Sequence, residues 1–228
     1  MEKQCPDQKY LWGKQHLQRE QEFIELENVP NGFAKKCIGY LPENATVLEV
    51  GAANGRDARF FAKEKKCLVY ATDFALSALQ QLQKARERDK TTGLVHPFSA
   101  DTKDLPLNAA KLREFFDAVY ARSALHLSDE QLDKFLSEVK MMLKPRGFLM
   151  VEGKPRDDFK IQRSREVSPN LVCDHDGHLR RLWSEENIKR IIDDMGLKLL
   201  CINCAEEEWR GKKTKFINFI AQKYENEQ

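Results

Sequence analysis

The segment TVLEVGAANGRDARFFA, from Thr46 to Ala62, contains the clearest structural signal of the chain. Its first five residues form an apolar run around one acid, as in a buried strand, and its last residues have the apolar spacing of a helix. The small residues GAANG, 51–55, lie between these two patterns. A strand that ends in small residues and restarts as a helix typically brings its backbone close to a ligand. The stretch therefore predicts a ligand-binding turn after a first strand.

The spacing within this turn indicates which ligand. A dinucleotide fingerprint places its third small residue where this chain has Arg56, and an arginine there cannot pack closely on the strand. The pattern E-x-G-x-G-x-G fits better, with Glu49, Gly51, Ala53 and Gly55. A carboxylate before the turn is unfavourable beside a pyrophosphate but suits an ammonium or sulfonium group. We therefore expect S-adenosylmethionine as the ligand.

Apolar runs and helical patterns alternate along the rest of the chain. Helical patterns occupy 55–65, 75–90, 129–143 and 184–195, with one or two more within 14–41, and candidate strands occupy 46–50, 67–73, 93–100, 116–122, 147–153, 197–203 and 215–223. This alternation predicts an α/β fold with a doubly wound, Rossmann-like sheet. The segment CAEEEWRGKKT, 204–214, is too short and polar for a crossover helix. We expect it to be the solvated tip of an antiparallel hairpin.

Acidic residues lie at or next to the ends of three successive candidate strands. Glu49 is next to last in the first, Asp73 ends the second, and Asp101 follows the third. Such strand ends converge on the crevice where open α/β sheets bind ligands. We expect Asp73 to accept hydrogen bonds from both ribose hydroxyls and Asp101 to accept one from the adenine amino group. Phe74 is expected to cover the adenine face.

Length and composition favour one domain over residues 1–228, with an N-terminal helical cap at 1–40 and a substrate lid at 154–183. The 228 residues are 41% hydrophobic, and 38 basic against 36 acidic residues leave a net charge of +2. Near-neutral charge makes nucleic acid an improbable partner. No apolar run approaches membrane length, so we expect no membrane partner. Six scattered cysteines favour a protein whose thiols are reduced, so we expect a cytoplasmic location. Cys201 and Cys204 are expected on opposite faces of a strand, and we expect no metal.

Five segments resemble the class I S-adenosylmethionine-dependent methyltransferases, of methyltransferase type 11/12, over nearly the whole chain from about residue 40. They are VLEVGAANG, VYATD, SADTKDLPL, FDAVYARSALHLSDEQ and MMLKPRGFLMVEGK. The resemblance implies a seven-stranded sheet of order 3-2-1-4-5-7-6 with strand seven antiparallel. It implies S-adenosylmethionine as cofactor, S-adenosylhomocysteine as product, and cofactor contacts from Glu49, Gly51, Ala52, Ala53, Gly55, Asp73, Phe74, Asp101, Thr102 and Ala121. YARSALHL and DHDGHLRRLWSEENIKRI resemble a narrower group of small-molecule enzymes related to tellurite resistance.

The chain departs from this family pattern at three positions. Ala53 replaces the middle glycine of the turn, Ala75 stands where a helix-capping serine is common, and Arg146 replaces a glycine of L-K-P-G-G. None of these changes removes a carboxylate that the cofactor needs.

Methyl transfer from a sulfonium is an in-line displacement, so alignment of the acceptor matters more than a nucleophilic triad. The resemblance places Tyr120, Arg122 and His126 at the mouth of the acceptor pocket. His126 is the candidate base, because an ordinary imidazole pKa lies close to working pH. Packing at a helix start is its alternative role. Further substrate contacts are expected from the lid and the N-terminal segment, at Trp12, His175, His178 and Arg181, with Arg180 beside them.

We expect a small-molecule methyltransferase that is a monomer or homodimer. A protein or nucleic-acid methyltransferase is an alternative, and it would be favoured by a basic face or an appended recognition domain. A non-catalytic partner subunit with the same fold is another alternative, although the intact carboxylates of the cofactor site speak against it. A dehydrogenase is disfavoured by Arg56.

Overall fold

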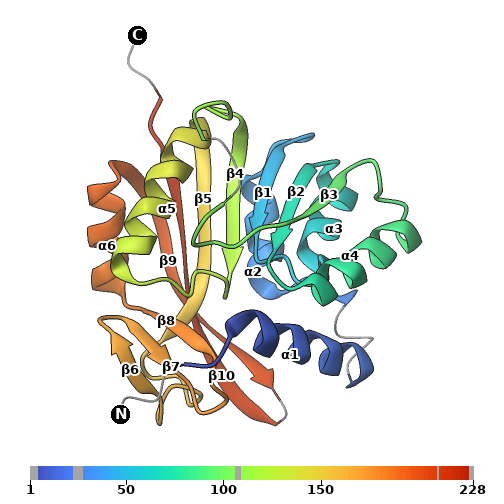
Figure 1. Ribbon diagram of the computed structural model, residues 1–228. Helices are drawn as coiled ribbons and strands as arrows, with labels where there is room; N and C mark the ends of the chain where they lie inside the picture. The colour runs from blue at the N-terminus through green and yellow to red at the C-terminus, as the bar shows by residue number, and fades with distance from the viewer. Residues whose placement is uncertain (1–4, 23–27, 106–108, 210, 226–228) are drawn as a thin grey trace.

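A seven-stranded mixed sheet forms the centre of the computed structural model, which describes residues 5–22, 28–105, 109–209 and 211–225 (Figure 1). Its order is β3-β2-β1-β4-β5-β10-β9. Only β10 runs antiparallel to its neighbours β5 and β9 in this sheet. The order and the reversed strand confirm the prediction. The strands are β1 (Thr46–Val50), β2 (Leu68–Asp73), β3 (Val95–Ser99), β4 (Phe116–Arg122), β5 (Leu143–Pro155), β9 (Leu197–Trp209) and β10 (Lys212–Lys223).

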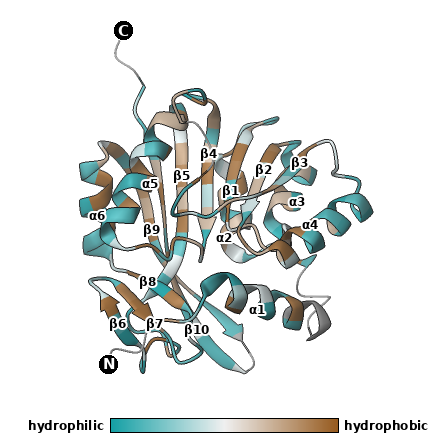
Figure 2. Cartoon of the chain, in the orientation of Figure 1, coloured by the Kyte–Doolittle hydropathy of each residue, from teal (hydrophilic) through white to brown (hydrophobic). Residues whose placement is uncertain are grey.

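Helices cover both faces of the sheet. Successive residues of a strand point to opposite faces of the sheet, so Val119 of β4 packs in one apolar cluster and Tyr120 in the other. The first cluster joins the sheet to α5 (Asp129–Met142) and α6 (Glu185–Asp194), and the second joins it to α2 (Gly32–Cys37), α3 (Arg56–Lys65) and α4 (Leu76–Arg88). A short 3-10 helix, η2 (Ile38–Tyr40), follows α2. Figure 2 shows the resulting apolar strands between helices with polar outer faces.

The first helix, α1 (Gln8–Glu22), lies across the carboxyl ends of the central strands (Figure 1). Two side chains of α4 attach to its backbone: Ser77 Oγ donates to Gly13 O at 3.1 Å, and Gln81 Nε2 donates to His16 O at 3.2 Å. The N-terminal segment therefore covers the edge of the sheet where ligands bind in folds of this type. None of the described helices is long and apolar enough to cross a membrane.

Residues 154–183, expected to be irregular, contain three short strands. They are β6 (Arg165–Ser168), β7 (Leu171–Cys173) and β8 (Leu179–Trp183), paired antiparallel in chain order. β8 also pairs with the end of β5 at Lys154 and Pro155. The strands escape sequence patterns because each is only three to five residues long, and β6 and β8 also contain charged residues. A small cluster of Ile161, Val172 and Leu182 is their apolar core.

The charged segment 204–214, expected to be a solvated hairpin tip, is mostly strand. β9 continues to Trp209 and β10 begins at Lys212, with Glu207 directly opposite Thr214. The prediction of a loop was wrong because charge in a sequence does not show that a neighbouring strand supplies the backbone hydrogen bonds. This extension of the hairpin reaches the candidate site.

Candidate active site

The turn after β1 has a backbone that favours small residues. Gly51, Ala53 and Gly55 all have positive φ, at +70°, +52° and +69°. A Cβ atom at Gly55 would lie 2.0 Å from Leu82 Cδ1, and one at Gly51 would lie 2.4 Å from the Cβ of Ala124. Glycine is therefore required at both positions for shape as well as for φ. Ala53 keeps the left-handed conformation that the missing glycine would adopt.

Asp73 holds this turn in place from the end of β2. Its Oδ2 accepts a hydrogen bond from Ala53 N at 2.9 Å, and its Oδ1 accepts one from Ala75 N at 2.8 Å. Burial raises the pKa of Asp73, while the backbone N–H donors oppose the rise. Ala75 provides no side-chain cap for α4. The carboxylate thus ties together the turn and the start of α4.

Glu49 presents an unpartnered carboxylate oxygen to the site. The residue is only 3% exposed, and its Oε2 has no hydrogen-bond partner among the described residues. Burial, followed by repulsion from Asp57, raises its pKa well above the ordinary value. A buried acceptor without a donor is costly. The position is therefore suited to a donor that a ligand supplies.

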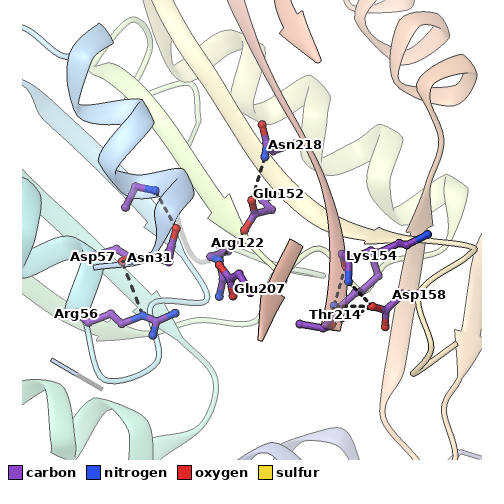
Figure 3. Close-up of polar contacts among 12 residues, drawn as sticks. Asn31, Arg56, Asp57, Arg122, Glu152, Lys154, Asp158, Glu207, Thr214 and Asn218 are labelled. Carbon is purple, nitrogen blue, oxygen red and sulfur yellow. Dashed lines mark hydrogen bonds and ion pairs between the residues drawn. The ribbon is translucent and has the colours of Figure 1, made fainter. Parts of the chain in front are cut away.

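Asp57 is the third buried acid of the site, and a polar network fixes it (Figure 3). Its carboxylate accepts hydrogen bonds from the backbone N of Asn31 at 3.1 Å, from the side-chain Nδ2 of Asn31, and from the Tyr120 hydroxyl at 3.1 Å. Tyr120 is fully buried between Phe33 and Phe61 and does not line the cavity. Tyr120 thus lies beneath the site, where it positions Asp57.

These acids lie on one side of a cavity of about 1120 Å³, open solvent at its mouth included. The cavity brings together ten of the predicted site residues: Trp12, Glu49, Gly51, Ala52, Ala53, Asp73, Phe74, Thr102, Arg122 and His126. Seven predicted residues do not line it: Gly55, Asp101, Tyr120, Ala121, His175, His178 and Arg181.

Several of these seven have structural contacts instead. Asp101 Oδ1 accepts a hydrogen bond from Lys103 N at 3.0 Å. Arg181 is buried and donates from Nη2 to Asp129 Oδ1 at 2.7 Å, which joins β8 to the start of α5. His175 is exposed, and His178 is buried with its ring edge-on to Trp12, at 4.6 Å between centroids.

His126 and Trp12 form a stacked pair over the cavity. Their ring centroids are 5.5 Å apart and their planes differ by 6°. His126 Nδ1 accepts a hydrogen bond from the backbone of Arg181 at 3.5 Å. Burial, and then the charge of Arg180, lower the pKa of His126 to about 3. The imidazole is thus neutral near pH 7, and the expectation of a base with an ordinary pKa does not hold.

Two acids clamp Arg122 at the end of β4 (Figure 3). Its Nε donates to Glu152 Oε1 at 2.7 Å, and its Nη2 donates to both oxygens of Glu207 at 2.8 and 2.7 Å. Burial alone lowers the pKa of Arg122, but the two acids outweigh burial and keep the pKa above its ordinary value. The guanidinium also stacks over Phe216, 4.7 Å from the ring centroid. The extended hairpin thereby fixes a cation of the site.

Lys154 at the end of β5 is fixed in a similar way. Its Nζ donates to Asp158 Oδ2 at 3.3 Å, to the Thr214 hydroxyl, and to Lys215 O at 2.8 Å. Burial lowers the pKa of Lys154 to about 8, against the opposing effect of Asp158. All three donors of the ammonium group are therefore used within the protein.

Arg180, expected beside the substrate contacts of the lid, lines the cavity. Sequence reasoning missed other residues that line it, notably Arg56, Asp57, Lys154, Lys160 and Phe216. One signal was available: Lys154 directly follows a predicted strand, Arg122 ends another, and the carboxyl ends of parallel strands lie at one edge of the sheet. Phe216 belongs to the hairpin, and no local pattern around it pointed to the site.

Comparisons with known proteins agree with this geometry. Residues 47–147 match a family model described as a methyltransferase domain. Among curated protein sequences, no significant match to the chain is found.

The solved structures with a similar fold have low sequence identity. A chain from the complex of the Haloferax volcanii Trm112 methyltransferase activator with its putative methyltransferase is 14% identical, with a TM-score of 0.70 over 99% of this chain and 100% of that chain. The 1,6-didemethyltoxoflavin-N1-methyltransferase of Burkholderia thailandensis is 15% identical, with a TM-score of 0.68 over 99% and 94%. An S-adenosylmethionine-dependent methyltransferase of Methanosarcina mazei is 18% identical, with a TM-score of 0.66 over 84% and 98%. The sheet order and the glycine turn described above therefore agree with a methyltransferase domain over residues 47–147, and the chain as a whole has the fold of these solved structures.

Proposed function

We propose that this protein transfers a methyl group from S-adenosylmethionine to a small-molecule acceptor. The observation that carries the proposal is the cavity at the carboxyl edge of the sheet, with the unpartnered Glu49 carboxylate on one wall and α1 across the other. A buried acceptor suits the cationic end of the cofactor, and a covered cavity suits an acceptor that fits inside it.

The acidic wall fits the cofactor. Glu49 would accept from its ammonium group, the turn at Gly51 would pass close to its methionine part, and Asp73 would bind its ribose. Phe74 and Thr102 line the cavity and would contact the adenine, with Asp101 nearby in the chain. When bound, S-adenosylmethionine supplies an activated methyl group, because its sulfur departs as a neutral thioether.

The opposite wall would align the acceptor and exclude water. Trp12 and His126 cover the cavity as a stacked pair, and Arg180 lies over the Trp12 ring at 4.7 Å from its centroid. Orientation in such an enclosed site is worth about 7–11 kcal/mol of the barrier. Neutral His126 would orient the acceptor through a hydrogen bond, and the proposal needs no charged base.

Similar structures support a small acceptor by what their names state. One is a methyltransferase for 1,6-didemethyltoxoflavin, and another, from Haemonchus contortus, is a phosphoethanolamine N-methyltransferase. The Haloferax volcanii structure contains an activator protein, so a partner subunit is the second arrangement to test.

Calorimetry and a transfer assay test the proposal. We expect S-adenosylmethionine to bind with a Kd of about 1–10 μM, or roughly −7 to −8 kcal/mol, and NAD not to bind. Tritiated cofactor is then offered with thiols, phenols, carboxylic acids and metalloid oxyanions, and separately with protein and RNA. Label is expected in a small molecule only, and Asp73→Ala should abolish it while the exposed Glu64→Gln does not.

Two results would contradict the proposal. Binding of NAD without S-adenosylmethionine would refute the cofactor. Label found only in protein or RNA would refute the small acceptor while the cofactor assignment stands.

A further inference from the structure

Charge is divided between the two sides of the cavity. The acidic residues on its wall come from β1, α3 and β2 and are Glu49, Asp57 and Asp73. The basic residues from β4, from β5 and the turn after it, and from β8 are Arg122, Lys154, Lys160 and Arg180. Arg56 is the exception on the acidic side, where its Nε lies 3.8 Å from Asp57 Oδ1. The cofactor proposed above uses the acidic side, so the basic side is left for the acceptor.

The two arginines of the basic side keep hydrogen-bond donors that the protein does not use. Arg122 donates from Nε and Nη2, and its Nη1 forms no hydrogen bond with the described residues. Arg180 donates from Nε to Asp174 at 3.0 Å, and neither of its terminal amino groups forms a hydrogen bond with them. A guanidinium has no acceptor, so these groups can be satisfied only by acceptor atoms of a ligand or by water.

Acids behind both arginines fix the direction of these donors. Glu152 is buried and accepts from Arg122 as well as from Asn218 Nδ2 at 3.1 Å. Asp174 is buried beside Arg180; burial raises its pKa, but hydrogen bonds from His178 and the charge and hydrogen bond of Arg180 outweigh burial and hold the pKa below its ordinary value. Both acids stay hydrogen-bonded on the protein side. The donors that remain belong to cations that are already oriented, which reduces the ordering cost of binding.

Planar side chains lie beside these donors. Arg180 stacks over Trp12, and Arg122 stacks over Phe216. Lys154 Nζ lies 3.6 Å from the Phe216 ring centroid and adds charge without a free donor. The basic side therefore combines oriented cations with flat apolar surface.

We propose that the methyl acceptor is an anion with a planar, apolar body, and that its anionic oxygen group binds Arg180 and Arg122. This inference rests on the proposed function, since it assigns the acceptor of the same site. A cationic acceptor would meet only donors on this side, and a neutral one would form weaker hydrogen bonds. Carboxylate and phosphate share the required chemistry.

A matched set of probes tests the inference on protein saturated with S-adenosylhomocysteine. Benzoate, phenyl phosphate, benzamide and benzylammonium share one ring and differ in the head group. By calorimetry, we expect benzoate or phenyl phosphate to bind about tenfold or more tightly than benzamide, and benzylammonium not to bind. The anion that binds tells a carboxylate acceptor from a phosphate acceptor.

Variants of Arg180 give the second readout. Arg180→Gln should weaken anion binding about tenfold or more. Arg180→Lys should restore part of the affinity, because lysine keeps the positive charge but lacks the paired donors of the planar guanidinium. The affinity for S-adenosylhomocysteine should stay within about twofold in both variants, which also shows that they are folded. Lys189→Gln removes the same charge from the exposed face of α6 and should change nothing.

The outcomes separate the two proposals. Failure of wild-type protein to bind S-adenosylhomocysteine contradicts the proposed function. If that ligand binds, but benzamide binds as tightly as the anions, no anion binds, or Arg180→Gln leaves the preference unchanged, then the anionic acceptor is wrong and the methyltransferase proposal stands.

Discussion

Replacement of Glu49 by Gln should make the ligand-free protein more stable and the cofactor weaker. Glu49 is buried with one carboxylate oxygen unpartnered, and burial together with Asp57 raises its pKa well above 4.5. The folded chain therefore keeps a proton that the unfolded chain releases above about pH 4.5. As pH rises from there toward the folded pKa, the free energy of unfolding of the wild type falls, and the loss persists at higher pH. Glutamine does not titrate, so the variant escapes this loss.

The size of each effect follows from the unpartnered oxygen. An unsatisfied buried polar group costs about 1–3 kcal/mol, more when charged. Glutamine keeps a polar group in the same place, so the variant should gain at pH 8 only the additional cost of the buried charge, about 1–3 kcal/mol. Each kcal/mol raises Tm by about 2–4 °C in a domain of this size. A charge-assisted hydrogen bond to the ligand is worth about 1.5–3 kcal/mol. Its loss should raise the Kd of S-adenosylhomocysteine about 10- to 150-fold.

Two measurements check this prediction. Thermal unfolding without ligand, from pH 4.5 to pH 8, should show the gap in Tm between variant and wild type widening as pH rises. Calorimetry at pH 8 gives the affinity. Glu64→Gln, at an exposed site on α3, is the control and should alter neither quantity. An unchanged affinity would remove Glu49 from the cofactor site, and a variant less stable than wild type at pH 8 would refute the argument from burial.

Three further predictions test other parts of the structure. The pKa of His126 is lowered from 6.5 to about 3, so its contribution to the free energy of unfolding is present above pH 6.5 and is lost as pH falls toward 3. NMR titration should find its ring neutral from pH 5 to 8, and a pKa near 6.5 would contradict this. Gly55→Ala should cost about 2–4 kcal/mol in denaturant unfolding, from positive φ and overpacking. Gly32→Ala, with nothing within 4 Å of its new Cβ, should cost less than about 1 kcal/mol, and equal losses would exclude the close approach as the cause. Glu152→Ala should lower the free energy of unfolding by about 3–5 kcal/mol, because it breaks a buried ion pair with Arg122. Glu207→Ala, whose side chain is 37% exposed, should lower it by less than about 1 kcal/mol in the same assay, and the reverse order would refute the role of burial.

Local patterns were sufficient where one segment contained the whole signal. The strands at 46–50 and 116–122 have the predicted bounds, because an apolar run between polar turns needs no distant partner to be read. The turn after β1 likewise contains its own requirements in Gly51 and Gly55. By contrast, the hairpin extension of β9 and β10 was missed, since its polar residues are stabilised by each other across the pair.

The candidate site divides in the same way. Glu49 and Asp73 were found because each lies at or next to the end of a predicted strand at the ligand-binding edge. Tyr120 also belongs to such a strand, but its side chain points to the opposite face of the sheet from the neighbouring Val119 and packs beneath the site. The alternation along a strand shows that neighbouring side chains point to opposite faces of the sheet. Only the packing of the helices shows which of these side chains reaches the cavity.

The α/β class, the order of the main elements, the glycine turn and the acids Glu49 and Asp73 beside it follow from the amino-acid sequence, because strand and helix periods and turn conformations are local properties of the chain. Three properties come from tertiary packing instead: which side chains share the cavity, that His126 is neutral, and that acids fix Arg122 and Arg180 while leaving them free donors. Those properties depend on burial and on distances between segments far apart in the chain, such as Arg122 and Glu207.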